Sequence, residues 1–154
     1  MDIIQKVRKI FQQNELDFKR QLQNVCALLK TQKEHFDWVG FYLVDQSKKN
    51  LRLVAYSGEP TQHERIPFGK GICGQVAESN QVFIVPDVAA ENNYLSCSPK
   101  VKSEIVYPIL INDKNVGQID IDSHKKNAFD SNDERLLKNI CHTVTKYFPS
   151  NFVI

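Results

Sequence analysis

Long apolar runs and an excess of charge of one sign are both missing from this sequence. No stretch approaches the roughly 20 apolar residues of a membrane-spanning helix, and the charged residues among the first ten argue against a secretory leader. The 20 basic and 18 acidic side chains give a net charge of +2, too small a surplus to neutralise nucleic-acid phosphates. We therefore expect a cytoplasmic protein that binds neither membranes nor nucleic acids.

Metal-binding motifs are missing as well. The histidines show no H-x-x-x-H spacing and the cysteines no C-x-x-C spacing, so we expect no bound metal. In a reducing cytoplasm the cysteines are thiols at rest, and any disulfide would be a transient, chemical one. The histidines expected at the surface or in turns are His35, His63, His124 and His142.

The length and composition predict one domain over residues 1–154. An apolar fraction of 42% and a charged fraction of 25% are close to globular averages. Apolar residues at helical spacing predict an N-terminal helical segment within residues 1–32 that packs on the sheet, and a C-terminal helix over 130–148. The apolar stripe weakens around residues 12–15, where Asn14 could cap a new helix. Two helices or one long bent helix are both possible, and we favour two.

Short apolar and aromatic segments predict five strands, among them two hairpins. The strands are residues 37–44, 51–57, 81–85, 105–111 and 115–122. A short helix is expected at 72–78, and 86–103 form a long loop, of a length that is usually functional or disordered. Terminal helices around hairpins indicate an α+β fold, an antiparallel sheet with helices on one face and the other face solvated or covered by loops.

Strand alternation collects polar and aromatic side chains on that second face. Trp38, Gly40 and Tyr42 share one side of their strand, where the rings either leave a hollow for a cation or a polarised sulfur or simply pack beneath a loop. Asp120 and Asp122 share a side of another strand with Gln118, and Glu104 could join them. Burial would raise the pKa of one such carboxyl until it can donate a proton, and the alternative is a solvated sheet face.

The cysteines fall into two groups. Cys26 and Cys141 lie on apolar helix stripes, where a thiol behaves as a small buried hydrophobe. Cys73 lies in the turn GKGICGQ, and Cys97 lies in the long loop near Lys100 and Lys102. Both thiols could react, and the positive charge near Cys97 favours its thiolate. Incidental thiols are the alternative at both positions.

Several separated segments, taken in order, resemble the free methionine-R-sulfoxide reductases, a family of stand-alone GAF domains. These are WVGFYL at 38–43, RIPFGKGICGQVA at 65–77, PDV at 86–88, Cys97, SEIVYP at 103–108 and VGQIDIDS at 116–123. The resemblance implies a GAF-like fold, a six-stranded antiparallel sheet with helices on one face and a loop-covered pocket for one free amino acid on the other.

The resemblance also implies roles for particular residues. Cys97 matches the cysteine that attacks the sulfoxide sulfur, and Cys73 matches one that resolves the resulting sulfenic acid into a disulfide. The implied substrate-binding residues are Trp38, Tyr42, Glu104, Asp120 and Asp122. No bound cofactor is implied, and an external dithiol of the thioredoxin type would restore the thiols.

The chain departs from the family pattern at one position. Members commonly carry a third cysteine just before R-I-P, where this chain has His63. Two thiols are the minimum for the chemistry, so we expect Cys73 and Cys97 to suffice. The alternatives are a non-catalytic GAF module that binds or senses a small ligand, and a general redox-sensing thiol protein. The oligomeric state stays open between a monomer and a homodimer.

Overall fold

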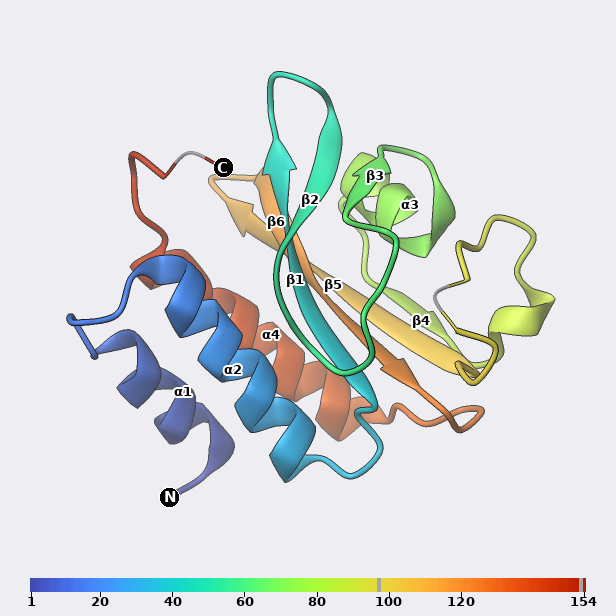
Figure 1. The fold of residues 1–154 in the computed structure, drawn as a ribbon, viewed down its shortest axis with the longest axis horizontal. Helices are drawn as coiled ribbons and strands as arrows, with labels where there is room; N and C mark the ends of the chain where they lie inside the picture. The colour runs from blue at the N-terminus through green and yellow to red at the C-terminus, as the bar shows by residue number, and fades with distance from the viewer. Residues whose placement is uncertain (97, 153) are drawn as a thin grey trace.

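The strands form one antiparallel sheet in the order β3-β2-β1-β6-β5-β4 (Figure 1). The structure, a computed structural model, describes residues 1–96, 98–152 and 154. Its strands are β1 (Trp38–Asp45), β2 (Asn50–Ser57), β3 (Arg65–Pro67), β4 (Phe83–Val85), β5 (Ser103–Ile111) and β6 (Lys114–Ser123). Its helices are α1 (Ile3–Phe11), α2 (Phe18–Gln32), α3 (Gly71–Ser79), α4 (Ser131–Tyr147) and the 3-10 turn η1 (Val88–Ala90). The predicted α+β architecture is confirmed.

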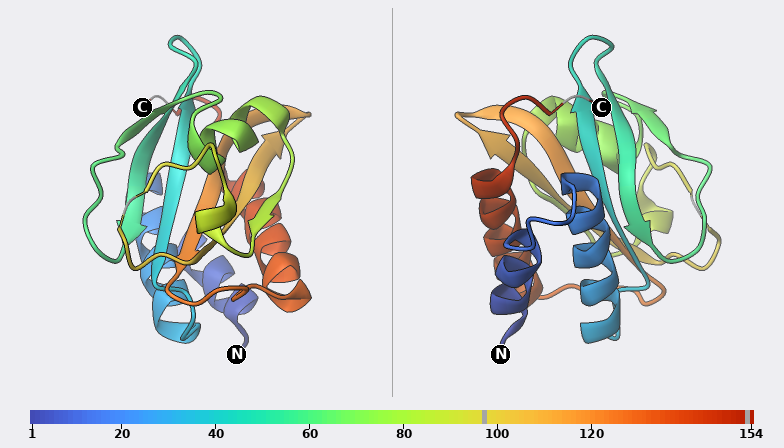
Figure 2. Two further views of the ribbon diagram at one scale, coloured as in Figure 1. Left: turned by 90° about the vertical axis from the view of Figure 1, so that its right-hand side faces the viewer. Right: turned by 60° about the vertical axis from the view of Figure 1, so that its left-hand side comes forward.

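Helices α2 and α4 cover one face of the sheet, and α1 packs on both of them (Figure 2). Helix α2 contacts β1 and β2, and α4 contacts β5 and β6. The buried cluster between these layers contains Val39, Phe41 and Leu43, the side of β1 opposite to its aromatic face. Cys26 and Cys141 are buried in the same cluster, where loss of water raises the pKa of each thiol. Both thiols are buried in the core, as predicted.

Local capping explains where the helices begin. Two N-terminal helices form, as favoured, but Asn14 is the wrong cap, because Asp17 accepts the hydrogen bond from the backbone N–H of Arg20 at the start of α2. Asp130 caps α4 at the expected position, in a reciprocal capping box with Asp133. Strand β3, which sequence reasoning missed, has only three residues, too few for an alternating pattern to show.

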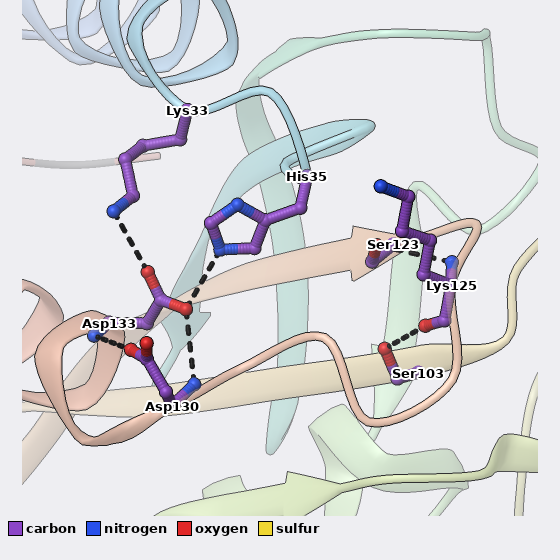
Figure 3. Close-up of polar contacts among 7 residues, drawn as sticks. All are labelled: Lys33, His35, Ser103, Ser123, Lys125, Asp130 and Asp133. Carbon is purple, nitrogen blue, oxygen red and sulfur yellow. Dashed lines mark hydrogen bonds and ion pairs between the residues drawn. The ribbon is translucent and has the colours of Figure 1, made fainter.

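A buried carboxylate anchors the start of α4 to the segment before β1 (Figure 3). Asp133, only 1% exposed, accepts from His35 Nε2 at 2.8 Å, pairs with Lys33 Nζ at 3.1 Å and accepts from the backbone N–H of Asp130 at 3.1 Å. Nearby, the Ser103 hydroxyl donates to the carbonyl oxygen of Lys125 at 2.6 Å. These contacts fix the chain between β6 and α4.

The Asp133→Ala variant should be destabilised, because it loses the acceptor for the Asp130 backbone N–H in the capping box and leaves Lys33 and His35 without their carboxylate partner. We expect a decrease of about 2 kcal/mol in the free energy of unfolding, measured by urea denaturation. The neighbouring Asn132→Ala, whose side chain is exposed, is the matched control and should change little. Equal stability of the two variants would contradict this role for Asp133.

The opposite face of the sheet is covered by α3, which contacts β2, β3, β5 and β6, and by loops (Figure 2, left). A second buried cluster lies there and contains Trp38, Tyr42 and Cys73. In the described residues the predicted loop over 86–103 has one turn of 3-10 helix and otherwise no helix or strand before β5. No helix of the described chain combines the length and the apolar character needed to cross a bilayer.

Candidate functional site

The strand register places the predicted acidic residues side by side on the loop-covered face. Asp122 on β6 lies opposite Glu104 on β5, and on its other side opposite Trp38 on β1. Asp120, two residues back on the same face, lies opposite Gly40. Directly opposite side chains in an antiparallel pair have Cβ atoms about 4.5 to 5.5 Å apart. The three carboxyl groups are therefore neighbours.

These carboxyl groups are buried. Asp120 and Asp122 are each 3% exposed and Glu104 is 5% exposed, which excludes the alternative of a solvated sheet face. Burial raises the pKa of Asp120, and burial together with the charge of Asp120 raises the pKa of Asp122 well above its ordinary value. The cluster can therefore hold protons at a pH where isolated carboxyls are ionised.

One strand face also presents buried acceptor atoms. Asp120 Oδ1, Asp122 Oδ1 and Gln118 Oε1 are buried and accept no hydrogen bond from any described residue. A buried acceptor without a donor costs free energy unless a ligand or solvent supplies the donor. The face is thus complementary to a cationic ligand or one rich in N–H and O–H groups.

The Asp122→Asn variant should be more stable than the parent protein at neutral pH. Between the ordinary pKa and the raised one, the carboxyl is protonated when folded and ionised when unfolded, so stability falls as pH rises through this range and stays lower above it. A rise of one pKa unit corresponds to about 1.4 kcal/mol. The amide does not titrate and avoids this cost.

We therefore expect a higher Tm for Asp122→Asn at about pH 7, with the gain shrinking as the pH is lowered towards about 4, near the ordinary carboxyl pKa. Thermal unfolding across this range measures both quantities. Asp113→Asn, in the exposed turn between β5 and β6, is the control and should show no such trend. A gain that grows on acidification would refute the argument.

Cys73 lies at the edge of the acidic cluster. It follows the glycine turn into α3, where Gly69 and Gly71 have positive φ values of 86° and 64°. Its Sγ donates to Glu104 Oε2 at 4.0 Å. Burial, followed by the charges of Asp120 and Glu104, raises the pKa of the thiol well above its ordinary value. Cys73 is therefore a neutral thiol at rest.

The same groups have the spacing of a metal site. The ligand atoms of Cys73, Glu104 and Asp120 all lie within 4.8 Å of one another, close enough for one divalent ion to bridge. They come from α3, β5 and β6, so no sequence-spacing motif could have revealed them. The expectation of no bound metal stays a prediction.

The aromatic side chains on β1 pack closely, which is the second of the two alternatives for this face. The Trp38 ring lies over Gly40, and a Cβ atom at Gly40 would overlap its six-membered ring. The ring centroids of Trp38 and Tyr42 are 6.5 Å apart. The idea of an open hollow for a cation between two rings is therefore wrong, and glycine is needed at position 40 for the indole to fold down onto the sheet.

Two small cavities lie between this face and its covering segments. One, of about 10 Å³, is lined by Tyr42, His63, Ile66, Lys70, Gly71, Ile72, Cys73, Leu95, Glu104 and Asp120. The other, of about 20 Å³, is lined by Asp37, Trp38, Glu59, Pro60, Ser98, Val101, Asp122 and His124. Each has room for about one water molecule. A wider hollow of about 310 Å³ beside the C-terminal segment contains none of the predicted site residues, so we place the site at the two small cavities.

Of the predicted site residues, the fold brings together Trp38, Tyr42, Cys73, Glu104, Asp120 and Asp122. Cys97 lies outside the described residues. Sequence reasoning missed Gln118 and His63 as members of the site. Gln118 was visible on the same face as the two aspartates, whereas the position of His63 depends on the path of a loop.

The sheet, its helical layer and the loop-covered pocket define a GAF domain, and residues 15–147 match the GAF domain family. GAF domain-containing protein A of Dictyostelium discoideum is 43% identical over 77% of this chain and 73% of its own. The free methionine-R-sulfoxide reductase of Saccharomyces cerevisiae is 34% identical over 81% of this chain and 72% of its own. The enzyme of that name from Neisseria meningitidis, solved in complex with its substrate, superimposes with a TM-score of 0.88 at 33% identity, covering 95% of this chain and 86% of that one. The chain belongs to the free methionine-R-sulfoxide reductase family.

Proposed function

We propose that this protein reduces free L-methionine (R)-S-oxide to methionine, with Cys97 as the nucleophile. The observation that carries the proposal is the buried cluster of three carboxyl groups beside Cys73, in a member of this reductase family. The solved relative from Neisseria meningitidis, described as a complex with its substrate, supports the free amino acid as ligand. The cavities are too small for it, so the covering segments have to move apart for it to bind.

The carboxyl groups suit both polar ends of this substrate. Ionised carboxylates with unfilled acceptor atoms bind the ammonium group, and a protonated one donates to the sulfoxide oxygen. The raised pKa of Asp122 makes it the first candidate for the acid. Trp38 and Tyr42 border the same space and contact the apolar part of the substrate.

In the first step, the Cys97 thiolate attacks the sulfoxide sulfur while the acid protonates its oxygen. The attack forms a bond between the Cys97 sulfur and the methionine sulfur and breaks the S–O bond. The released hydroxide then attacks the Cys97 sulfur, and methionine leaves with the electron pair of the S–S bond, so that Cys97 becomes a sulfenic acid. The sulfoxide is reduced by two electrons and the cysteine is oxidised by two. The neutral thiol of Cys73 is poorly suited to this attack, which supports Cys97 for the role.

In the second step, Cys73 condenses with the sulfenic acid. The Cys73 sulfur attacks the Cys97 sulfur and forms the disulfide, while the Cys73 proton passes to Glu104 and from there to the leaving hydroxyl, which departs as water. The disulfide requires Cα atoms about 4.4 to 6.8 Å apart. An external dithiol, of the thioredoxin type in a reducing cytoplasm, then restores both thiols. No bound cofactor or metal is required at any step.

Separating the two epimers of free methionine sulfoxide tests the proposal. The protein is incubated with each epimer and dithiothreitol. It should convert the R epimer to methionine, and two thiols of the reductant should be oxidised for each methionine formed. Chromatography of the products measures methionine and oxidised dithiothreitol. Saturable binding without methionine formation would instead favour a ligand-sensing GAF module. Disulfide formation with peroxide as efficient as with the sulfoxide would favour a redox sensor.

A further inference from the structure

The loop over residues 58–64 is held to the sheet by the two aromatic side chains of β1. Trp38 Nε1 donates to the carbonyl oxygen of Glu59 at 3.0 Å. The Tyr42 hydroxyl donates to the carbonyl oxygen of His63 at 2.8 Å. Both donors are on buried residues, so they fix the loop backbone at two points.

The side chains of the same two loop residues reach the segment that covers the pocket. His63 Nε2 lies 3.0 Å from the carbonyl oxygen of Ser96, and in the tautomer or charge state with a proton on Nε2 it donates to that oxygen. Glu59 pairs with Lys100 Nζ at 3.0 Å. Ser96 and Lys100 lie on either side of Cys97 in the chain. Each loop residue therefore connects the sheet, through its carbonyl oxygen, to the covering segment, through its side chain.

We propose that Glu59 and His63 are positioning residues for Cys97, because they hold Ser96 and Lys100, the described residues on either side of it. The inference rests on the proposed function and extends it to residues that act through the covering segment. His63 occupies the position of the family's third cysteine, and here that position supplies a hydrogen bond to the covering segment in place of a thiol.

We expect the two links to affect the reaction rate more than the free energy of unfolding. The Glu59–Lys100 pair is more than half exposed, and such pairs contribute little to global stability. Misplacing a nucleophile by about 1 Å, however, can cost about a hundredfold in rate. Loss of either link should therefore lower the rate of methionine release and leave the KM for the sulfoxide nearly unchanged.

Charge exchange tests the first link. Glu59→Lys and Lys100→Glu should each slow single-turnover methionine release by about tenfold, and the double variant should return to within about threefold of the parent. Glu64→Lys, the same change at an exposed position of the same loop, is the control and should keep the parental rate. A double variant as slow as the singles would overturn the role of this pair.

The second link is tested at His63. His63→Ala should slow methionine release by about tenfold, and His63→Gln, whose side-chain amide can donate to the Ser96 carbonyl, should recover most of the rate. Hydrogen exchange of the peptide over 91–102, without substrate, should speed up in His63→Ala and Glu59→Lys and slow again in the charge-exchanged double variant. Unchanged rate and exchange in His63→Ala would overturn the proposal. If hydrogen exchange changes as expected but the parent protein forms no methionine, the two links to the covering segment are supported and the proposed activity is refuted.

Discussion

Cys97→Ser is expected to form no detectable methionine from free methionine-R-sulfoxide, with dithiothreitol or with a thioredoxin system as the reductant. A serine hydroxyl is not ionised at neutral pH and does not accept oxygen from a sulfoxide, so the variant lacks the nucleophile of the first step. We expect a loss of at least about a thousandfold in turnover. Product chromatography under saturating substrate measures it.

The residues proposed to bind the substrate do not include Cys97, so this variant distinguishes a loss of catalysis from a loss of binding. Cys97→Ser should still bind the substrate with an enthalpy measurable by calorimetry, because the acidic cluster and aromatic residues are unchanged. Cys141→Ala, which removes a thiol buried against the helices, is the matched control and should retain turnover. Undiminished methionine formation by Cys97→Ser would remove Cys97 from the mechanism.

Cys73→Ser is expected to release one equivalent of methionine and then stop when thioredoxin is the only reductant. The first step needs only the thiolate of Cys97, whereas recycling through a disulfide needs the second thiol. A rapid single-turnover measurement should therefore show a burst of about one methionine per protein molecule, followed by no further product.

The raised pKa of the Cys73 thiol explains why its loss should affect the second step and not the first. Burial beside Asp120 and Glu104 raises the pKa of this thiol. In the proposed mechanism it stays protonated until Cys97 becomes a sulfenic acid and Glu104 takes the proton. Cys26→Ser, at another buried cysteine, tests whether loss of any thiol has the same effect and should cycle normally. Continued thioredoxin-driven turnover by Cys73→Ser would show that another group resolves Cys97.

Much of the site could be predicted from strand alternation alone. The period of two along β6 put Asp120 and Asp122 on one face, and the same period along β1 separated Trp38 and Tyr42 from the core. The register then adds Glu104 by pairing β5 with β6, as the short turn between them suggested. Alternation along a strand is a local property, so it can be predicted without knowing how the rest of the chain packs.

Other features depend on contacts that have no sequence period. The indole of Trp38 fills the space above Gly40, because only the packed structure decides which way a ring folds. The contact of His63 with Ser96 joins two loops that are 33 residues apart. A cap at Asp17 in place of Asn14 depends on which of two polar residues lies three positions before a free backbone N–H. Spacing rules could not anticipate these contacts.

The most direct measurement of the central claim is to trap the oxidised nucleophile. Cys73→Ser is mixed with free methionine-R-sulfoxide in the presence of a sulfenic-acid-selective 1,3-diketone, and its peptides are analysed by mass spectrometry. The account predicts one label on Cys97 for each methionine released, and none with the S epimer or with methionine itself. Methionine released without any label on Cys97, or a label that forms equally well without the sulfoxide, would contradict it.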